Sequence, residues 1–231
     1  MKFDTKISAS KNGEHHVYDH AMSKLMQKNS FTDVVFLLYT GKLPTDGERV
    51  LLDTMLVSAT EHGVEAPSLY VPRVSAASCN SVHVAIAAGV LAMGEEHGGA
   101  GEAAAYLLSR NEDVQTLVEE YVANGKRMPG YGHRIYKDED PRAMIIYIKA
   151  KETKAPLAAF EKAYAIESEL AKTKRKKLPL NIDGAFAAGV LALGMDPRAA
   201  KALFVLARVA GMGAHAIEEL EQKNGYRRLE Q

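Results

Sequence analysis

Apolar residues recur at helical spacing along most of this chain of 231 residues. Residues 47–62, GERVLLDTMLVSATEH, and residues 156–172, PLAAFEKAYAIESELAK, are both amphipathic at a period of 3.6 residues. The second segment places Leu157, Phe160 and Tyr164 on one face. Each segment is therefore predicted to be a helix with one buried side.

Two further segments, 80–94 and 181–195, are apolar almost all round, which is typical of buried helices. Both are rich in alanine and glycine, so their backbones can approach neighbouring elements closely. Asp196 and Pro197 follow the second segment as a cap residue and a first-turn proline. They predict a last helix over residues 198–222.

The same pattern indicates the fold class and the division into domains. No segment shows sustained alternation of apolar and polar residues, so any strand is confined to short pieces such as SLYV, residues 68–71. The sequence predicts an all-α fold. Charged residues are densest between residues 101 and 177, which we expect to form a smaller and more mobile helical subdomain. The large helical domain would then comprise residues 1–100 and 178–231.

Composition excludes several classes of protein. Lys and Arg together number 29, as do Asp and Glu, so the net charge gives no sign of a nucleic-acid or membrane partner. The single cysteine, Cys79, can form neither a disulfide framework nor a cysteine-based metal site. The N-terminus lacks the apolar core of a signal peptide, and no apolar run approaches the roughly 18 residues of a membrane span. We therefore expect a cytoplasmic protein.

The most distinctive stretch is residues 128–142, MPGYGHRIYKDEDPR. Glycines before His133 let the backbone approach a ligand and restrict the direction of the imidazole. Asp140 and Pro141 signal a helix start, which would bring the Arg142 guanidinium near His133, where it could clamp a carboxylate. The alternative is a Gly/Pro loop whose histidine is merely polar surface.

A second histidine, His97, opens HGGAGEA between two apolar segments. A Gly-Gly pair at a helix start exposes backbone N–H groups that could hold an anion or a developing oxyanion. Without the spacing of a nucleotide fingerprint, however, such glycines more often form a turn.

Two charged residues lie within apolar segments. Asp183 stands at the mouth of segment 181–195, where burial would raise its pKa and suit it to act as a base; alternatively, it simply caps the helix. Arg208 is a lone cation among apolar residues of segment 198–222. It needs a buried partner, which either a protein carboxylate or a substrate carboxylate would supply.

Taken in order, these elements resemble the citrate synthase superfamily. GYGHRIYKDEDPR resembles the family signature, HGGAGEA its first catalytic histidine, NIDGAFAAGVLALG its aspartate helix and LFVLARVAGMGAHAIEEL its arginine helix. ATEHGVEAPSLYVPRVSA resembles the acidic-His stretch that precedes them, in which His62 would contact substrate. The matches span roughly residues 50 to 228.

The resemblance implies a citrate synthase-like helical fold, an obligate homodimer and a set of catalytic roles. Asp183 would move a proton at the methyl group of acetyl-CoA, His97 would stabilise the enol, and His133 would exchange a proton with the keto-acid oxygen. The carboxylates of oxaloacetate or citrate would be bound by His62, Arg142 and Arg208, joined across the dimer interface by Arg227 or Arg228 near the C-terminus.

The resemblance also implies a site for coenzyme A on the smaller subdomain, with the larger domain forming the dimer. The basic run at residues 172–177 would contact the phosphates, although a charge run is more often a solvated loop. The predicted CoA contacts are Pro129, Gly130, Tyr131, Gly132, Lys174, Arg175, Lys177 and Asn181. The spacing of His16 and His20 lacks a supporting set of metal ligands, and we predict neither a metal nor a tightly bound cofactor.

The chain also departs from the synthases. Only about sixty residues precede His62, and both EHGVEAP and the first forty residues look closer to the citryl-CoA lyase module of ATP-citrate lyase. That module does not usually carry a histidine equivalent to His97. We therefore predict a compact citryl-CoA lyase that cleaves (3S)-citryl-CoA to acetyl-CoA and oxaloacetate.

Two alternatives stay open, as do the partners. A short citrate or 2-methylcitrate synthase would use the same site, and no single residue decides whether the thioester is hydrolysed. A non-catalytic relative could bind CoA or a tricarboxylate as a regulatory subunit, although such a subunit would not need an acid and a base. A citryl-CoA synthetase partner and an oligomer larger than a dimer are also open.

Overall fold

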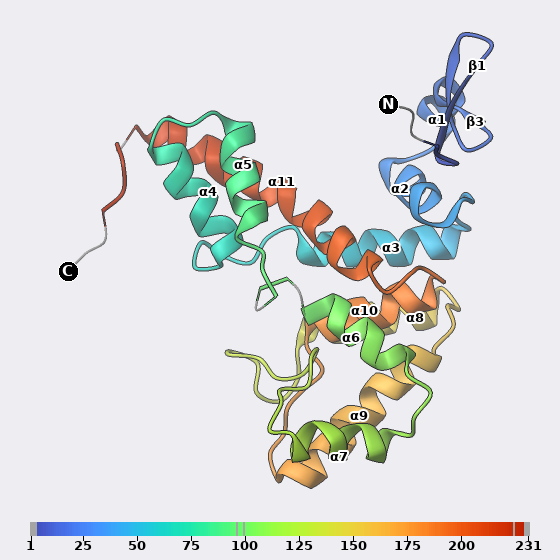
Figure 1. Ribbon diagram of the computed structural model, residues 1–231, viewed down its shortest axis with the longest axis vertical. Helices are drawn as coiled ribbons and strands as arrows, with labels where there is room; N and C mark the ends of the chain where they lie inside the picture. Colours follow the sequence, from blue (N-terminus) through green and yellow to red (C-terminus); the bar gives the residue numbers. More distant parts are fainter. Residues whose placement is uncertain (1–3, 96, 99, 224, 229–231) are drawn as a thin grey trace.

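The fold is built almost entirely from helices. The computed structural model describes residues 4–95, 97–98, 100–223 and 225–228, which contain eleven α-helices and one three-stranded sheet (Figure 1). The strands are β1 (Ser8–Lys11), β2 (Glu14–Val17) and β3 (His20–Ala21). The helices are α1 (Met22–Lys28), α2 (Phe31–Thr40), α3 (Asp46–Ala59), α4 (Pro67–Ala77), α5 (Val82–Leu91), α6 (Ala100–Ser109), α7 (Val114–Ala123), α8 (Pro141–Glu152), α9 (Ala158–Lys174), α10 (Ile182–Ala192) and α11 (Ala199–Gln222). The predicted helical class is confirmed.

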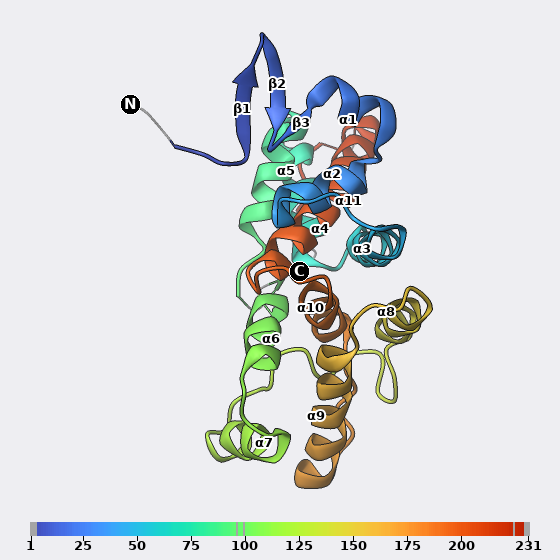
Figure 2. The ribbon, with the colours of Figure 1, turned by 90° about the vertical axis from the view of Figure 1, so that its right-hand side faces the viewer.

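Helix α10 lies at the centre of one half of the molecule. Eight of its eleven residues are buried, as expected for a segment that is apolar on all sides. It packs against α6, α8 and α9, which surround it in Figure 2. The first turn of α10, which carries Asp183, is therefore positioned by several elements at once.

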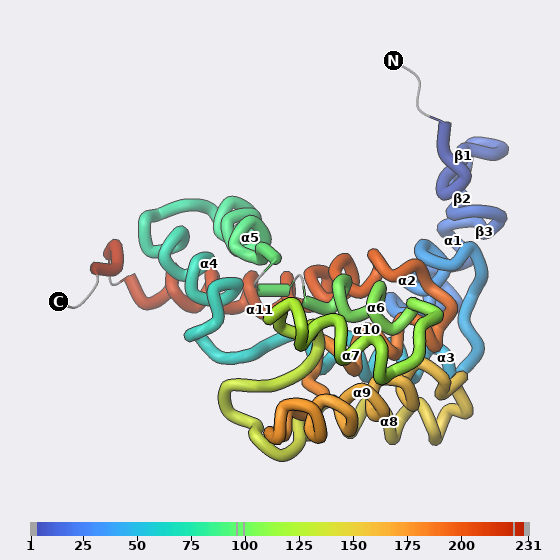
Figure 3. The backbone as a smooth tube through the Cα atoms, turned by 60° about the horizontal axis from the view of Figure 1, so that its bottom comes forward, coloured from blue at the N-terminus to red at the C-terminus, as the bar shows by residue number. Residues whose placement is uncertain are grey.

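Helix α11 joins this half to a second group of helices. It contacts α3 and α6, and its C-terminal part lies beside α4 and α5 in the lobe at the left of Figures 1 and 3. By length and composition alone α11 could cross a membrane, which corrects our expectation that no segment approaches a span. Its contacts with other helices, and the buried charged residues Arg208 and Glu219, are those of a core helix.

The N-terminal sheet is the part of the fold that the sequence pattern missed. Strands β1 and β2 pair with Lys11 opposite Glu14, so Asn12 and Gly13 form a two-residue turn. Both turn residues have positive φ, 54° and 76°, as a type I′ turn requires. The strands are largely exposed and lack alternation, but Asn-Gly was a signal that could have identified this hairpin.

The segment SLYV is helical, so its assignment as a strand was wrong. Residues 68–71 lie at the beginning of α4, whose first residue is Pro67, a favoured starting position. Leu69 is completely buried whereas Tyr70 is 46% exposed, in keeping with one buried helix face. A four-residue apolar run fits a strand and a buried helix equally well, and its length alone could not separate them.

The predicted helices agree with the structure to within a few residues. Segments 80–94 and 181–195 contain α5 and α10, and segments 47–62 and 156–172 cover all but one or two end residues of α3 and α9. Helix α11 begins only at Ala199, because the Asp196 side chain accepts the backbone N–H of Arg198 in a turn before the helix. One apolar core includes residues from α3, α6, α9, α10 and α11. The division of the chain into a larger and a smaller domain at residues 101 and 177 stays a prediction.

Candidate active site

The guanidinium of Arg142 is the centre of the candidate site. Asp140, the buried N-cap residue of α8, accepts from Arg142 Nε at 3.0 Å and from Nη2 at 2.8 Å. Its Oδ2 also accepts the backbone N–H of Ile182 at 3.1 Å, which ties α8 to α10. Burial alone would raise the pKa of Asp140, but the hydrogen bonds and charge of Arg142 outweigh it and lower this pKa. Arg142 is thus held in one orientation.

Two histidine rings lie against Arg142. His62 Nδ1 is 3.2 Å from Nη1, His133 Nε2 is 3.3 Å from Nη2, and the ring centroids are 6.0 Å apart. Because a guanidinium can only donate, His62 Nδ1 accepts, and the proton of its neutral ring lies on Nε2. Burial, followed by the charge of Arg142, lowers the pKa of both rings. Both histidines are therefore neutral at neutral pH.

His133 is oriented by the loop that follows it. The backbone N–H groups of Ile135 and Tyr136 both donate to its Nδ1 at 3.1 Å, and the Tyr136 ring stacks on it at 4.8 Å. Nδ1 is therefore an acceptor and, because a neutral imidazole carries one proton, that proton lies on Nε2, so the approach of Nε2 to Arg142 Nη2 is a contact between two donors. An oxygen bound by Arg142 would meet Nε2 directly. The structure thus brings His133 and Arg142 together as the loop pattern predicted.

Arg208, Ser68 and His97 form a second chain of contacts. Arg208, 2% exposed, donates from Nε to the Ala59 carbonyl at 2.6 Å and from Nη1 to the Ser68 hydroxyl at 2.9 Å. Ser68 Oγ lies 2.9 Å from His97 Nε2, and the Ser68 N–H donates to the same nitrogen at 3.3 Å. His97 Nε2 is therefore an acceptor, which leaves its proton on Nδ1. Burial and then the charge of Arg208 lower the pKa of His97.

The surroundings of His97 are described only in part. Gly98 follows it with a φ of +88°, and α6 begins at Ala100. Gly99, the second glycine of the predicted anion-binding pair, lies outside the described residues. The oxyanion site on backbone N–H groups therefore stays a prediction, whereas the orientation of the His97 ring does not depend on it.

Arg208 makes no ion pair within the described ranges of the chain. Its two acceptors, the Ala59 carbonyl and the Ser68 hydroxyl, are neutral. Burial lowers the pKa of Arg208, and the charges of Glu61 and Asp183 act in the opposite direction. Of the two partners that the sequence left open, a protein carboxylate and a substrate carboxylate, these residues do not supply the first. A buried cation of this kind favours the binding of an anion.

Asp183 is not the cap of α10. Asn181 occupies that position, and its Oδ1 accepts from the N–H groups of Asp183 and Gly184 at 3.0 and 3.2 Å. Burial raises the pKa of Asp183, Arg142 and Arg208 oppose this rise, and Asp140 adds to it. A carboxyl group with a raised pKa can act as an acid or a base near neutral pH.

Two adjoining cavities give access to the three histidines of the site. The first, of about 480 Å³, is lined by His62, His97 and His133 together with parts of the loops around them. The second, of about 730 Å³, also reaches His133, and Arg134 lines both. This arrangement suits a ligand in two parts, one beside the histidines and one in the larger cavity.

The larger cavity has a basic and aromatic lining. It contains five cationic side chains and two tyrosines, namely Lys126, Arg127, Arg134, Lys174, Lys176, Tyr121 and Tyr131. Of the residues predicted to contact CoA, the lining includes Tyr131, Gly132 and Lys174 but not Pro129, Gly130, Arg175, Lys177 or Asn181. Our sequence analysis missed Lys126 and Arg127, which directly precede segment 128–142, and it included Lys176 only as part of the basic run at residues 172–177.

The glycines of the 129–132 loop serve close packing. Gly130 has a φ of +86°, and a Cβ on it would lie 2.8 Å from the Cα of Gly184. The N–H of Asn181 donates to the Gly130 carbonyl at 3.0 Å, and the Asn181 side chain donates to the Gly132 carbonyl at 2.9 Å. The loop is therefore docked on the start of α10, which fixes His133 relative to Asp183.

The C-terminal arginines lie at the far end of α11, away from α10 (Figure 1). Arg227 donates to the buried carboxylate of Glu219 at 2.5 and 2.9 Å. Arg228 is exposed and donates to the Tyr226 hydroxyl. Their predicted role in a partner subunit involves a second chain and stays a prediction.

Sequence comparison agrees with this geometry. The family model described as citrate synthase, C-terminal domain, matches residues 46–229, which include all the residues of the site described above. The chain belongs to the citrate synthase family. Members of this family with solved structures include a citryl-CoA lyase and citrate synthases.

Solved structures and curated relatives of the citrate synthase family extend the match. Citryl-CoA lyase from Hydrogenobacter thermophilus is 36% identical with a TM-score of 0.94, covering 99% of this chain and 91% of that one. Citrate synthase from Thermoplasma acidophilum, solved in a ternary complex with carboxymethyl coenzyme A and oxaloacetate, is 29% identical with a TM-score of 0.77, covering 88% of this chain and 56% of that one. Citrate synthase from Synechocystis is 35% identical over 82% of this chain and 50% of its own length. The chain spans about half the length of the curated relatives it matches.

Proposed function

We propose that this protein is a citryl-CoA lyase, which cleaves citryl-CoA into acetyl-CoA and oxaloacetate. The observation that carries the proposal is the similarity to the Hydrogenobacter thermophilus lyase. Its TM-score is 0.94 at 36% identity, compared with 0.77 at 29% identity for the Thermoplasma acidophilum synthase. The site geometry is consistent with this chemistry at both ends of the substrate.

The keto-acid end would bind beside Arg142 and Arg208. Arg142 presents Nη1 and Nη2 between two neutral histidines, and Arg208 is a buried cation whose protein acceptors are neutral. Together with the Nε2–H of His62, they supply donors for two carboxylates. His133 would take the proton of the tertiary hydroxyl at Nε2 as that group becomes the carbonyl of oxaloacetate, which requires the ring to bind substrate as the tautomer protonated on Nδ1.

The thioester end would bind beside His97 and Asp183. When the C–C bond breaks, its electron pair passes into the thioester as an enolate whose oxygen accepts a hydrogen bond from His97 Nδ1–H. Asp183, whose raised pKa favours the protonated carboxyl group, then gives its proton to the methylene carbon and forms the methyl group of acetyl-CoA. The reverse reaction would use the same groups in opposite senses.

The larger cavity would hold the CoA moiety. Its five cations suit the phosphates, and its tyrosines suit the adenine ring. Because this cavity and the histidine cavity share His133 and Arg134, a CoA thioester could reach from one into the other. We propose no metal and no tightly bound cofactor for this reaction.

The proposal includes a homodimer that completes the site. Exposed apolar side chains lie on α4, α5 and α11, among them Tyr70, Val84, Leu91 and Ile217. We propose that these exposed side chains, which belong to helices of the larger domain, form the interface with a second copy of the chain. Since Arg227 is bound to Glu219, Arg228 is the better candidate to reach the partner's keto-acid site.

A short citrate or 2-methylcitrate synthase is the second candidate, because curated relatives with both names match the chain at 30–35% identity. The cellular setting proposed for the lyase is the cytoplasm, with a citryl-CoA synthetase supplying the substrate. A CoA-binding regulatory subunit is the remaining alternative.

The test is to supply citryl-CoA, and separately acetyl-CoA with oxaloacetate, while free thiol and oxaloacetate are followed together. Formation of oxaloacetate and acetyl-CoA from citryl-CoA without free thiol is the result expected of a lyase. Release of free thiol together with citrate would establish a synthase instead. No turnover in either assay, with calorimetric CoA binding retained, would favour the regulatory alternative.

A further inference from the structure

Helix α11 holds the end of α3 at three successive residues. Arg208 donates to the carbonyl of Ala59, and His215 Nε2 lies 3.1 Å from Glu61 Oε1. Between them, Gly211 packs so closely that a Cβ on it would overlap the carbonyl oxygen of Thr60. Positions 208, 211 and 215 share one face of a helix. Residues 59–61 are therefore aligned along α11, and the next residue is His62.

The ring of His215 has one orientation and one tautomer in this contact. Its Nδ1 lies 3.2 Å from Arg73 Nη1 and, because a guanidinium can only donate, Nδ1 must accept. The ring proton is then on Nε2, where it is donated to the Glu61 carboxylate. The His215 side chain is only 19% exposed, so water competes little for these bonds.

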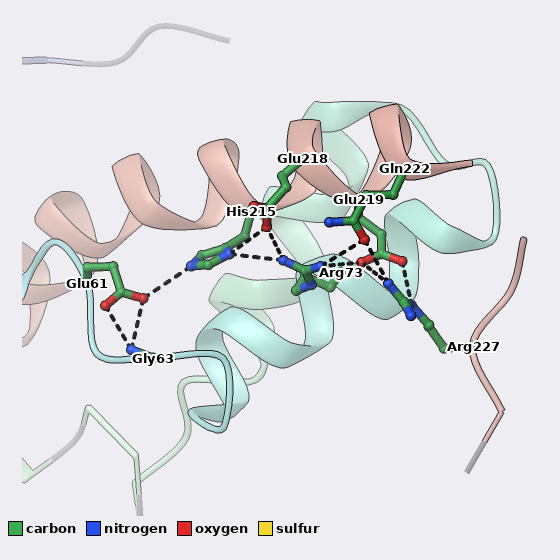
Figure 4. Close-up of polar contacts among 8 residues, drawn as sticks. All are labelled: Glu61, Gly63, Arg73, His215, Glu218, Glu219, Gln222 and Arg227. Atoms are coloured by element: carbon green, nitrogen blue, oxygen red, sulfur yellow. Dashed lines mark hydrogen bonds and ion pairs between the residues drawn. The ribbon is translucent and has the colours of Figure 1, made fainter. Parts of the chain in front are cut away.

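Glu61 passes this restraint on to the loop that carries His62. Both of its carboxylate oxygens lie 2.8 Å from the backbone nitrogen of Gly63. Burial alone would raise the pKa of Glu61, but the Gly63 N–H and His215 lower it on balance. Figure 4 shows Glu61 between the His215 ring and Gly63. The loop is thus anchored on both sides of His62, by Glu61 before it and Gly63 after it.

Arg73 is itself fixed by two carboxylates of α11. It pairs with Glu218 and, at 2.8 Å, with the fully buried side chain of Glu219. Glu219 also binds Arg227, so the C-terminal tail joins the same network (Figure 4). His215 is therefore held from the side opposite to Glu61 by a rigid partner.

We propose that His215 is a positioning residue for His62, acting through Glu61 and the Gly63 amide. The catalytic significance of this role rests on the proposed function, because His62 is there a keto-acid ligand. The positioning itself concerns the ligand-free protein. It can therefore be tested whether or not the protein cleaves citryl-CoA.

The experiment compares two substitutions that each reproduce one ring nitrogen. In His215→Gln the side-chain amide can occupy the Nε2 position and still donate to Glu61, whereas in His215→Asn it reaches only the Nδ1 position, facing Arg73. His83→Gln is the matched control, because His83 is an exposed histidine of α5 whose bond to Ser81 lies outside the network. The thermal midpoint of each variant shows whether it is folded.

The first measurement is amide hydrogen exchange of the loop around Gly63 in the ligand-free protein. We expect His215→Asn to speed exchange at Gly63 by about threefold to tenfold, the range expected for one lost hydrogen bond. His215→Gln and His83→Gln should exchange like the wild type. Wild-type exchange in a folded His215→Asn protein would overturn the proposal.

The second measurement is calorimetric affinity for oxaloacetate and, separately, for CoA. His215→Asn should weaken oxaloacetate binding by about threefold to tenfold and leave CoA binding unchanged, with His215→Gln restoring oxaloacetate affinity. Equal weakening of both ligands would point to general disruption and overturn the positioning role. If the wild type itself bound no oxaloacetate, the proposed function would fail while the exchange result still decided the position of the loop.

Discussion

The two arginines of the site, Arg142 and Arg208, differ in what balances their charge. Arg142 is bound through Nε and Nη2 by Asp140, whose side chain is completely buried. Arg208 is more enclosed, at 2% exposed, yet its acceptors are a backbone carbonyl and a serine hydroxyl. The charge of Arg142 is thus neutralised by a carboxylate of the protein. Among the described residues, no carboxylate forms an ion pair with Arg208.

Because of this difference, Arg142 is suited to orient a bound ligand, and Arg208 is suited to attract a carboxylate. A guanidinium fixed by a carboxylate presents its remaining N–H groups in a set direction, which suits the placing of a ligand oxygen against His133. A guanidinium held by neutral groups retains more of its field and attracts a carboxylate more strongly. The following predictions test this contrast, from the largest expected effect to the smallest.

Asp183 is electrostatically coupled to both arginines, so its replacement tests the whole arrangement. We expect Asp183→Asn to lower kcat for citryl-CoA by about two to four orders of magnitude, because an amide cannot move the proton. The affinity for CoA should change little, since the side chain keeps its size. Loss of calorimetric CoA binding along with turnover would show that the carboxylate has a structural role instead.

Removal of each arginine should have different consequences for stability. Arg142→Ala leaves the Asp140 carboxylate buried without its cation, and we expect the free energy of unfolding to fall by about 3–5 kcal/mol. Arg208→Ala leaves only neutral acceptors unsatisfied and should cost about 1–3 kcal/mol. Urea denaturation measures both. The double variant Asp140→Asn/Arg142→Ala should recover part of the loss, and equal losses in the two single variants would refute the contrast.

Ligand binding should depend on Arg208 in particular. Arg208→Ala should weaken oxaloacetate binding by about 2–5 kcal/mol, measured by calorimetry, because a buried charge pair is lost. Arg198→Ala is a suitable control, because Arg198 is an exposed arginine beside the start of α11 that pairs with Asp196. An oxaloacetate affinity equal to that of the wild type would remove Arg208 from the binding site.

Ser68 links the arginine that lacks a carboxylate partner to His97. Ser68→Ala removes the hydroxyl that accepts from Arg208 and contacts His97 Nε2, so the imidazole loses part of its orientation. We expect kcat to fall about threefold to tenfold, as for one hydrogen bond. Ser109→Ala, which removes a hydroxyl bonded only to its own helix α6, should leave kcat unchanged. A matching decrease in both variants would argue against a specific role for Ser68.

The smallest effect concerns stability and pH. Burial raises the pKa of Asp183, so this residue ionises near pH 4 in the unfolded chain but at higher pH in the folded protein. The wild type therefore loses stability as pH rises from about 4 through the folded pKa, and Asp183→Asn does not lose this contribution. Thermal unfolding should show a larger advantage of Asp183→Asn over wild type at pH 8 than at pH 4. An advantage that is constant with pH would mean that the pKa of Asp183 is not raised.

Much of the fold followed from local pattern, and the misses have local causes. A period of 3.6 residues identified α3 and α9, continuous apolar segments identified α5 and α10, and the start signal at Asp196 and Pro197 identified α11, because each of these signals lies within one continuous stretch of sequence. The exposed hairpin at Asn12 and Gly13 buries too little for any alternation to appear. The run SLYV was too short for its period to be read. Burial therefore imposed no pattern on the hairpin, whereas SLYV has a buried face but is too short for its period to be assigned.

The site was predicted less evenly. His62, His97, His133, Arg142 and Arg208 were all identified from the motifs, and the structure brings them around adjoining cavities and contacts. Ser68 was missed because a serine in an apolar segment has no distinguishing pattern. Asp140 was recognised only as a helix start, since its pairing with Ile182 joins residues 42 positions apart.

The sequence by itself determined which residues carry chemistry and which segments are helices, because residue type and helical period are local properties. Only the tertiary structure decided that Asn181 caps α10, so the Asp183 carboxylate is not used as the cap and is available to act as an acid or a base. It alone decided which ring nitrogens of His62, His97 and His133 carry a proton. It also decided that Asp140 balances Arg142 while Arg208 lacks such a partner in the described chain. These properties depend on hydrogen bonds and burial between segments far apart in sequence, whose geometry exists only when the chain is folded.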